Sequence, residues 1–212
     1  MPMIFLHGLG QNPSVWDKTL AHLPPETDAL CPDLSAFLTD ARASYDTMYR
    51  NFSAYCSRFP EPLTFCGLSL GAVLALNYAI DAPDKVASMV LAAPQYRMPR
   101  ALLTIQSLLF RFMPDTAFAD IGLKKADFLS LTSSMSRLNF TDRLDRIVCP
   151  VRVLCGEKDT VNRKAAEQLT EKLPCADFHA VGGAGHEINA DAPEQFAKLL
   201  LPCLSPVRSC EQ

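Results

Sequence analysis

The sequence contains no apolar run that approaches the roughly 18 residues needed for a membrane-spanning helix. It also has no basic excess, since 20 Lys and Arg are set against 23 Asp and Glu, for a formal net charge of −3. A protein that displaces counterions from nucleic acid needs a basic surface. The amino-terminal segment lacks the basic stretch typical of a signal peptide. We therefore expect a cytoplasmic protein with no membrane span and no nucleic-acid partner.

The eight cysteines include no Cys-x-x-Cys pair and no Cys/His ligand spacing, so the sequence predicts no metal site. Several of them, including Cys66 and Cys155, stand in apolar strand-like runs, where a thiol serves as a small hydrophobic group. With 212 residues, 49% of them hydrophobic, the chain can bury a core without cross-links. We expect reduced, structural thiols and a single domain spanning residues 1–212.

Short apolar runs alternate with helical stretches along the whole chain. The runs that predict buried strands are 3–6, 28–31, 63–66, 86–91, 151–155 and 177–181. The segments that predict helices between them are 41–59, 163–173 and 192–201, the last with Asp191 placed as its cap and Glu194 three residues on. This alternation predicts the α/β class: a three-layer sandwich around a mostly parallel sheet of about six strands. A site is then expected at the carboxyl ends of the strands.

Residues 67–71, Gly-Leu-Ser-Leu-Gly, form the most informative motif. They follow the apolar run 63–66 and lead into a helix-like run, which is the setting of a nucleophile elbow. The turn forces the serine into a strained backbone conformation with its hydroxyl exposed. Glycines are needed on both sides because side chains there would collide as strand and helix close up. The motif predicts that Ser69 is a catalytic nucleophile.

A serine hydroxyl is unreactive without an imidazole to take its proton and a carboxylate to orient that imidazole. Asp159 follows the strand-like run 151–155, and His186 follows the last strand in a glycine-rich loop. Ser69, Asp159 and His186 stand in the chain order that accompanies this elbow. Glu157 and Asp177 are alternative acids, and we favour Asp159 for its position.

The segment His7-Gly8-Leu9-Gly10 ends the first strand. A glycine-flanked turn there can aim a backbone N–H at developing negative charge, together with the N–H of the residue after the nucleophile. We therefore predict an oxyanion hole formed by the backbone of Leu9 and Leu70. His7 is expected to be structural and bonded within the turn.

At this point the chain resembles the α/β-hydrolase superfamily over nearly all of its length. Four landmarks match in order: residues 7–10 with Trp16 soon after, residues 67–71, Gly-Glu-Lys-Asp at 156–159, and Gly-His at 185–186. The resemblance implies a mostly parallel sheet and hydrolysis through an acyl-enzyme, without metal or organic cofactor.

The sequence departs from the family pattern at its start. Family members usually carry an antiparallel hairpin of two strands before the His-Gly strand, whereas here that strand begins almost at Met1. In the family's strand order, residues 28–31 would then form an exposed edge. Because an uncovered edge invites pairing or needs protection, we expect a monomer or a homodimer.

The family also places a lid over the active site, and here the lid insertion covers about residues 97–141. Leu102, Ile105, Leu109 and Phe112 recur at helical spacing before Pro114, and a second helix is expected to carry Phe128, Leu131, Met135 and Leu138. Most of these side chains are expected to pack the lid on the core. Leu102, Ile105 and Leu109, with Trp16, are the residues we expect to bind substrate in an apolar acyl pocket.

The resemblance favours a serine hydrolase that cleaves carboxylic esters of small, mainly apolar acyl groups, with a small-molecule ester as substrate. One alternative is a lyase similar to the menaquinone-pathway member of the superfamily. That relative typically has an arginine four residues after the nucleophile, where this chain has Val73. Arg97, Arg100 or Arg111 would have to replace it. A second alternative is a ligand receptor that retains the triad.

Overall fold

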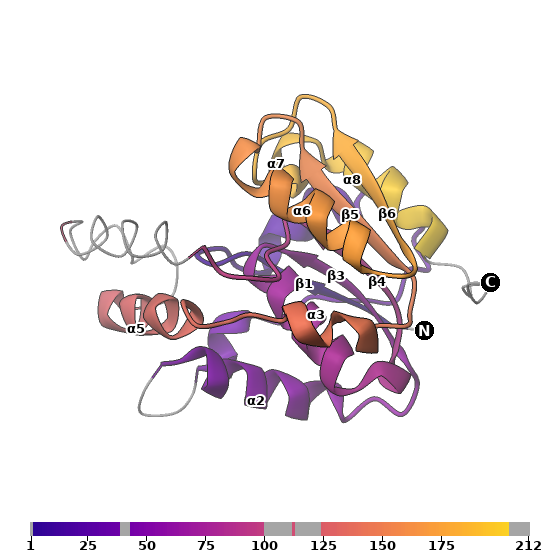
Figure 1. Cartoon of the computed structure of the whole chain (residues 1–212). Helices are drawn as coiled ribbons and strands as arrows, with labels where there is room; N and C mark the ends of the chain where they lie inside the picture. The colour runs from indigo at the N-terminus through magenta and orange to yellow at the C-terminus, as the bar shows by residue number, and fades with distance from the viewer. Residues whose placement is uncertain (1, 39–42, 100–111, 113–123, 204–212) are drawn as a thin grey trace.

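The computed structural model describes residues 2–38, 43–99, 112 and 124–203. Its centre is one six-stranded sheet in the order β2-β1-β3-β4-β5-β6, with every neighbouring pair parallel. The strands are β1 (Met3–Leu6), β2 (Ala29–Leu30), β3 (Leu63–Leu68), β4 (Val86–Ala92), β5 (Val151–Gly156) and β6 (Ala176–Val181). Figure 1 shows the twisted sheet with helices on both sides. The predicted parallel six-stranded sheet is confirmed.

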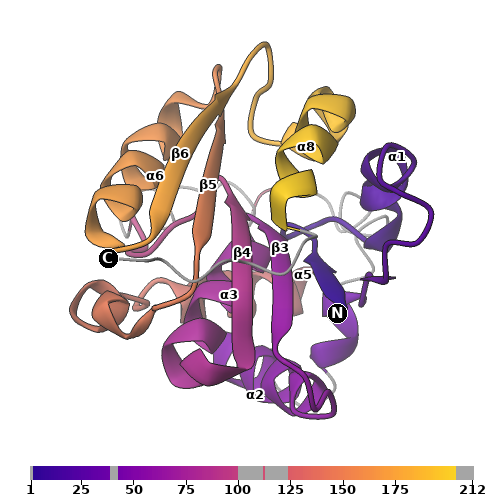
Figure 2. The same ribbon diagram turned by 90° about the vertical axis from the view of Figure 1, so that its right-hand side faces the viewer.

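The helices pack on the two faces of this sheet. They are α1 (Asp17–Leu20), α2 (Tyr45–Cys56), α3 (Leu70–Asp81), α5 (Lys125–Met135), α6 (Thr160–Lys172), α7 (Ile188–Asp191) and α8 (Pro193–Leu200). Short 3-10 helices lie at Pro13–Trp16, Leu34–Phe37, Pro83–Lys85, Thr141–Arg146 and Leu201–Cys203. In Figure 2, α1 and α8 lie on one side of the sheet and α3 and α6 on the other. The result is the three-layer sandwich that the sequence predicts.

One hydrophobic core lies between the sheet and the helices on each of its faces, because successive strand side chains point to opposite faces. In β1, Ile4 and Leu6 belong to the core under α2, α3 and α6, whereas Met3 and Phe5 belong to the core under α1 and α8. Helix α3 runs through the first core with eleven of its twelve residues buried, so it fixes the position of whatever precedes it. The residue that precedes it is Ser69.

The second core contains Trp16, which we expected to line a substrate pocket. Its indole ring packs against Phe5 and Phe196, with ring centroids 5.3 and 5.8 Å away, and none of its surface is exposed. The structure therefore places Trp16 inside the core, with no surface to offer a substrate.

Two helix boundaries differ from the prediction. Helix α2 begins at Tyr45, later than the predicted start at 41, because the Ser44 side chain accepts the N–H of Thr47 and caps it. The prediction that Asp191 caps the last helix is wrong. Helix α8 starts at Pro193 with Ala192 as its N-cap residue and no side-chain hydrogen bond to its first turn, whereas Asp191 ends α7. The Asp191 carboxylate instead accepts the N–H of Gly185, 2.7 Å away.

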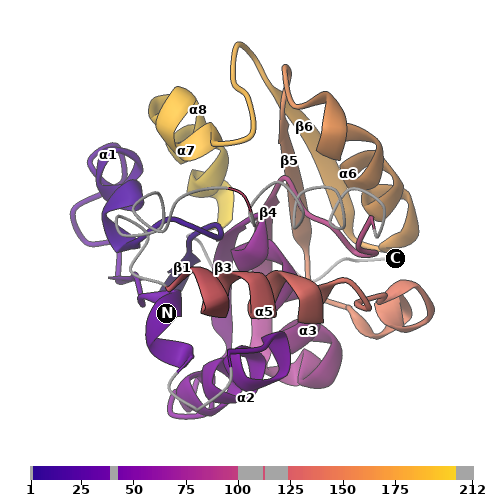
Figure 3. The ribbon, with the colours of Figure 1, turned by 90° about the vertical axis from the view of Figure 1, so that its left-hand side faces the viewer.

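The connection between β4 and β5 carries α5, seen in the foreground of Figure 3. Helix α5 lies beside α2, and Ser134 Oγ accepts the N–H of Tyr45 at 2.8 Å. Phe128, Leu131 and Met135 are buried on it. Leu102, Ile105, Leu109, Arg100 and Arg111 lie outside the described residues, so their roles stay predictions. At the sheet edge, β2 has only two residues, which leaves little backbone open to pairing.

Among the described cysteines, Cys175 is disulfide-bonded, which contradicts our expectation of reduced thiols for that residue. The free thiols are Cys31, Cys56, Cys66, Cys149, Cys155 and Cys203. In the described part of the chain, no helix has both the length and the apolar character needed to cross a membrane.

Candidate active site

Ser69 stands at the turn between β3 and α3, with φ 53° and ψ −109°. It is one of two non-glycine residues with positive φ among those described, the other being Ala93. Its N–H donates to Ala92 O on β4 at 2.9 Å, and its hydroxyl does not cap α3. A strained conformation that its neighbours hold in place is typical of functional residues.

The glycines around Ser69 are required by close packing. A Cβ on Gly71 would lie 2.1 Å from the carbonyl oxygen of Leu6, and one on Gly67 would lie 2.6 Å from the backbone of Ala72. Both contacts are with backbone atoms, which cannot move aside without shifting a strand or a helix. The glycine pattern of the motif thus has a direct geometric cause.

Asp159 and His186 come together at the carboxyl ends of β5 and β6. His186 Nδ1 lies 2.8 Å from Asp159 Oδ2, and the carboxylate is buried while the imidazole is about half exposed. The carboxylate can accept only from a protonated Nδ1, so the contact selects the tautomer in which Nε2 is free to take a proton. His186 is therefore oriented as a general base.

The alternative acids are engaged elsewhere. Glu157 is exposed and accepts the N–H of Gly183 at 2.9 Å. Asp177 pairs with Arg152 at 2.7 Å and with His179 at 2.9 Å on the outer strands. Neither carboxylate contacts His186 in the described part of the chain, which leaves Asp159 as the candidate acid.

The environment of Asp159 favours its charged form. Burial raises the pKa of this carboxyl, but hydrogen bonds from His186 and Asn162 outweigh burial and bring the pKa below its usual value. Asn162 was not among the residues we predicted. Its side-chain amide lies 2.9 and 2.8 Å from the two carboxylate oxygens of Asp159.

The loop after β1 is organised by His7. The buried ring accepts the N–H of Leu34 at Nε2, 3.0 Å away, so its proton is on Nδ1 and donates to Gly8 O at 2.9 Å. Burial lowers the pKa of His7, which agrees with a neutral ring. His7 therefore has the structural role that we predicted from the sequence.

The same contacts aim the candidate oxyanion donors. Gly8 O also accepts the N–H of Gln11 at 3.2 Å, and in a trans peptide the Leu9 N–H points away from Gly8 O. Leu70 is the first residue of α3, so its N–H has no acceptor within the helix. In the described chain neither N–H meets a hydrogen-bond acceptor. Both are available to a developing oxyanion.

The acid loop and the histidine loop are fastened to each other. Lys158 N–H donates to Ala184 O at 2.9 Å, and a Cβ on Gly156 would lie only 2.0 Å from Gly185 O. Asp191 binds the N–H of Gly185 from the other side. His186 thus follows a loop segment whose position depends on a glycine at the end of β5.

No hydrogen bond joins Ser69 Oγ to His186 within the described residues. The two residues follow β3 and β6, whose carboxyl ends lie at the same edge of the sheet. Catalytic hydrogen bonds are often long until substrate binds. Beside Leu9 and Leu70, a cavity of about 10 Å³ is also lined by Leu34 and Met48, which leaves room for about one water molecule.

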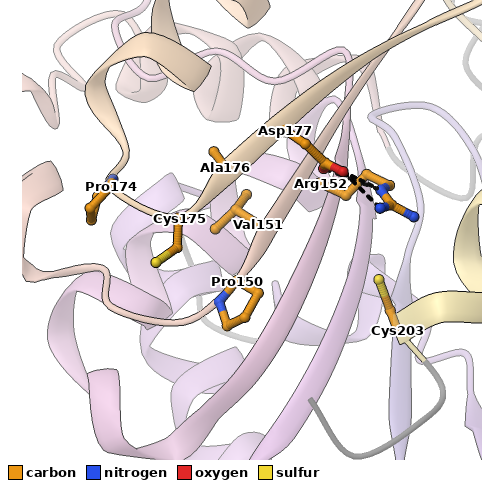
Figure 4. Close-up of a pocket in the computed structure, with 8 residues that line it drawn as sticks. All are labelled: Pro150, Val151, Arg152, Pro174, Cys175, Ala176, Asp177 and Cys203. Carbon is orange, nitrogen blue, oxygen red and sulfur yellow. Dashed lines mark hydrogen bonds and ion pairs between the residues drawn. The ribbon is translucent and has the colours of Figure 1, made fainter. Parts of the chain in front are cut away.

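A larger cavity, about 320 Å³, lies at the opposite edge of the sheet, where β5 and β6 begin (Figure 4). Arg152 and Asp177 lie on its wall and bind each other, and Arg152 also donates to Leu199 O at 3.0 Å. This cavity lies at the amino ends of β5 and β6, whereas Ser69 and His186 follow the carboxyl ends of their strands. It is therefore separate from the candidate active site.

Comparison with known proteins shows the family of the chain. The model of the Alpha/beta hydrolase family matches residues 3–199, so the chain belongs to that family. Monoacylglycerol lipase ABHD6 from Bos taurus is 20% identical, over 99% of this chain and 77% of its own length.

Two solved structures illustrate how widely the fold is shared. A thermophilic esterase from Thermogutta terrifontis has a TM-score of 0.79 at 19% identity, covering 96% of this chain and 89% of its own. MenH from S. aureus has a TM-score of 0.79 at 16% identity, covering 95% of this chain and 92% of its own. At these identities the likeness concerns the fold.

Proposed function

We propose that the protein is a carboxylic-ester hydrolase with Ser69 as nucleophile, His186 as general base and Asp159 as the orienting acid. The observation that carries the proposal is the 2.8 Å contact between Asp159 and His186, which leaves Nε2 free at the sheet edge where Ser69 stands in its strained turn.

In the proposed reaction, Ser69 Oγ attacks the ester carbonyl as His186 Nε2 takes its proton. The tetrahedral oxyanion binds the N–H groups of Leu9 and Leu70. The C–O bond to the alcohol then breaks, and His186 returns the proton to the departing alcohol. Water, deprotonated by His186, next attacks the carbonyl carbon of the acyl-enzyme. The bond from that carbon to Ser69 Oγ breaks, His186 returns the proton to Ser69 Oγ, and the carboxylic acid leaves. Water is the only co-reactant, so the reaction requires no cofactor.

A small, mainly apolar acyl group is the proposed substrate feature. Leu34 and Met48 give the small cavity beside the oxyanion donors an apolar part, next to the polar residues His7, Gln11 and Ser35. Its described lining includes no Lys or Arg that could pair with a buried carboxylate. The similarity to a monoacylglycerol lipase agrees with an ester substrate. A lyase that holds an anion at position 73 is disfavoured because Val73 is uncharged and buried. Arg97 is exposed, and its backbone forms an isolated antiparallel β-bridge with Asn139.

The test is a panel of p-nitrophenyl esters that differ in acyl length and charge, assayed with the wild type and with Ser69→Ala. Steady turnover by the wild type that Ser69→Ala abolishes supports the proposal. A single burst of product without turnover would favour a receptor that retains the triad. Turnover that survives in Ser69→Ala would refute the assignment of the nucleophile.

A further inference from the structure

Asn162 links the Asp159–His186 pair to Gln95 in the loop after β4. It is the third residue of α6, where its backbone N–H donates to Asp159 Oδ1 at 3.2 Å, and its side-chain nitrogen contacts both carboxylate oxygens. The same nitrogen lies 3.1 Å from His186 Nδ1. Asp159 therefore meets one residue at three points in addition to His186.

The orientation of the Asn162 amide is set by Gln95. The Asp159 carboxylate can only accept, which identifies the amide atom facing it as nitrogen, and the other end of the amide, Asn162 Oδ1, accepts from Gln95 Nε2 at 2.7 Å. Without Gln95, a rotation of 180° about the terminal bond would place the carbonyl oxygen against a carboxylate. Gln95 thus excludes the repulsive orientation.

Gln95 reaches Asn162 because the chain turns sharply after β4. Ala93 has φ 48°, an uncommon conformation for a residue with a side chain, and its N–H donates to Leu154 O on β5 at 2.8 Å. The turn begins beside Ser69, whose N–H binds Ala92 O. The loop that carries Gln95 is therefore anchored between β3 and β5, the strands that precede the nucleophile and the acid.

We propose that Asn162 is a positioning residue for the Asp159–His186 pair, and that Gln95 acts through Asn162. This inference rests on the proposed function. The carboxylate of Asp159 is otherwise able to rotate about its Cβ–Cγ bond, which would break the contact with His186 Nδ1. Two bonds from a neutral amide oppose that rotation and stabilise the charge without placing a cation beside the imidazole.

The contact between Asn162 and His186 gives a second consequence. Both nitrogens donate to the same carboxylate, so no hydrogen bond forms between them while Nδ1 is protonated. If Asn162 became an aspartate, a second negative charge would lie against the imidazole. Protonated His186 would then be favoured, and the rise of kcat with pH would move to higher pH.

The first test compares Asn162→Ala and Asn162→Asp with the wild type. We expect Asn162→Ala to lower kcat about 10- to 100-fold, the range seen when supporting residues are removed, with KM changed less than twofold. Asn162→Asp should lower kcat and also displace its pH profile toward higher pH. A loss that appears mainly in KM, or an unmoved profile in Asn162→Asp, would overturn the proposal.

The second test is a double-mutant cycle with a matched control. Gln95→Ala should lower kcat in the same direction, and the double variant should be no slower than Asn162→Ala alone. Gln168→Ala is the control, because Tyr96 donates to Gln168 Oε1 at 3.2 Å, joining the same loop to α6 without touching Asp159. Additive effects, or an equal loss in Gln168→Ala, would mean that the bridge only supports the fold.

A third readout does not depend on turnover. The hydrogen-bonded Nδ1 proton of His186 should give a downfield proton NMR signal in the wild type and in Gln168→Ala, but an exchange-broadened signal in Asn162→Ala. An unchanged signal in Asn162→Ala would overturn the positioning role. If the wild type hydrolyses no ester yet these signals behave as expected, the proposed function fails and the positioning role stands.

Discussion

Asp159 uses its two carboxylate oxygens for two tasks: Oδ2 accepts from His186 Nδ1 at 2.8 Å, and Oδ1 accepts the N–H of Asn162 at the start of α6. The acid of the proposed triad is also a helix cap. Truncation to alanine would therefore cost activity and, typically, about 0.5–2 kcal/mol of stability as well. Asp159→Asn separates the loss of activity from the loss of stability, because the carbonyl oxygen of its amide can still cap α6.

We predict that Asp159→Asn keeps substrate binding but lowers kcat by up to about 10⁴-fold, because an amide that donates to Nδ1 selects the wrong tautomer of His186. Steady-state kinetics with one ester would measure this. Glu157→Gln is the control, since its exposed carboxylate binds only a loop N–H in the described chain. Near-normal kcat in Asp159→Asn with a loss in Glu157→Gln would mean that the acid is misassigned.

Gly156→Ala is expected to lower kcat while the protein remains folded. Its Cβ would lie 2.0 Å from Gly185 O, so the loop that leads to His186 must move by more than 1 Å to reach normal contact. A displacement of that size at a catalytic group can cost about 100-fold in rate. Circular dichroism and kcat together would test the prediction.

The matched control is Gly182→Ala in the same loop, where a Cβ would meet nothing within 4 Å. We expect this variant to retain wild-type kcat. Equal losses in both variants would show that the loop tolerates no substitution, and the specific contact with Gly185 would not be the cause.

Stability should fall as the pH drops below about 6.5, in part because of His7. Burial lowers the pKa of His7 from its usual 6.5, so between the two values the unfolded chain binds a proton that the folded chain excludes. The stabilisation is complete above 6.5. Below it, up to about 1.4 kcal/mol is lost per pH unit until the lowered pKa is reached.

Urea denaturation between pH 5 and pH 8 would measure this loss, with His7→Gln as reference. Glutamine can accept the N–H of Leu34 but does not titrate, so its stability should depend less on pH than that of the wild type. Parallel curves for the two proteins would contradict the assignment of a neutral, buried His7.

The apolar surroundings of the proposed acyl site predict a preference for neutral esters. Each methylene that enters an apolar pocket contributes up to about 0.8 kcal/mol, so kcat/KM should rise a few-fold per carbon until the pocket is full. Matched p-nitrophenyl esters with neutral and carboxylate-bearing acyl chains would measure it. A preference for the anionic ester that disappears in Arg97→Ala or Arg100→Ala would instead favour the lyase-like alternative.

The six strands and the placement of Ser69, Asp159 and His186 after strand ends could be predicted from local sequence patterns, because each motif sits where an apolar run ends. The order of the strands could not, and only the family resemblance indicated that residues 28–31 form an edge. Asn162 and Gln95 carry no such signal, since they are 67 residues apart and meet only when β4 and β5 pair. The prediction that Trp16 binds substrate was wrong for a related reason. Its position after the oxyanion loop suggested a pocket, but only the fold brings Phe5 and Phe196 around it.

The central claim is that an acyl group is transferred to Ser69. The most direct measurement is the mass of the protein quenched during turnover of a p-nitrophenyl ester, followed by identification of the modified peptide. The account predicts a mass increase equal to the acyl group, located on Ser69, and none in Ser69→Ala, which should remain folded because only the hydroxyl is removed. An acyl group located on another residue, or full turnover by Ser69→Ala, would contradict it.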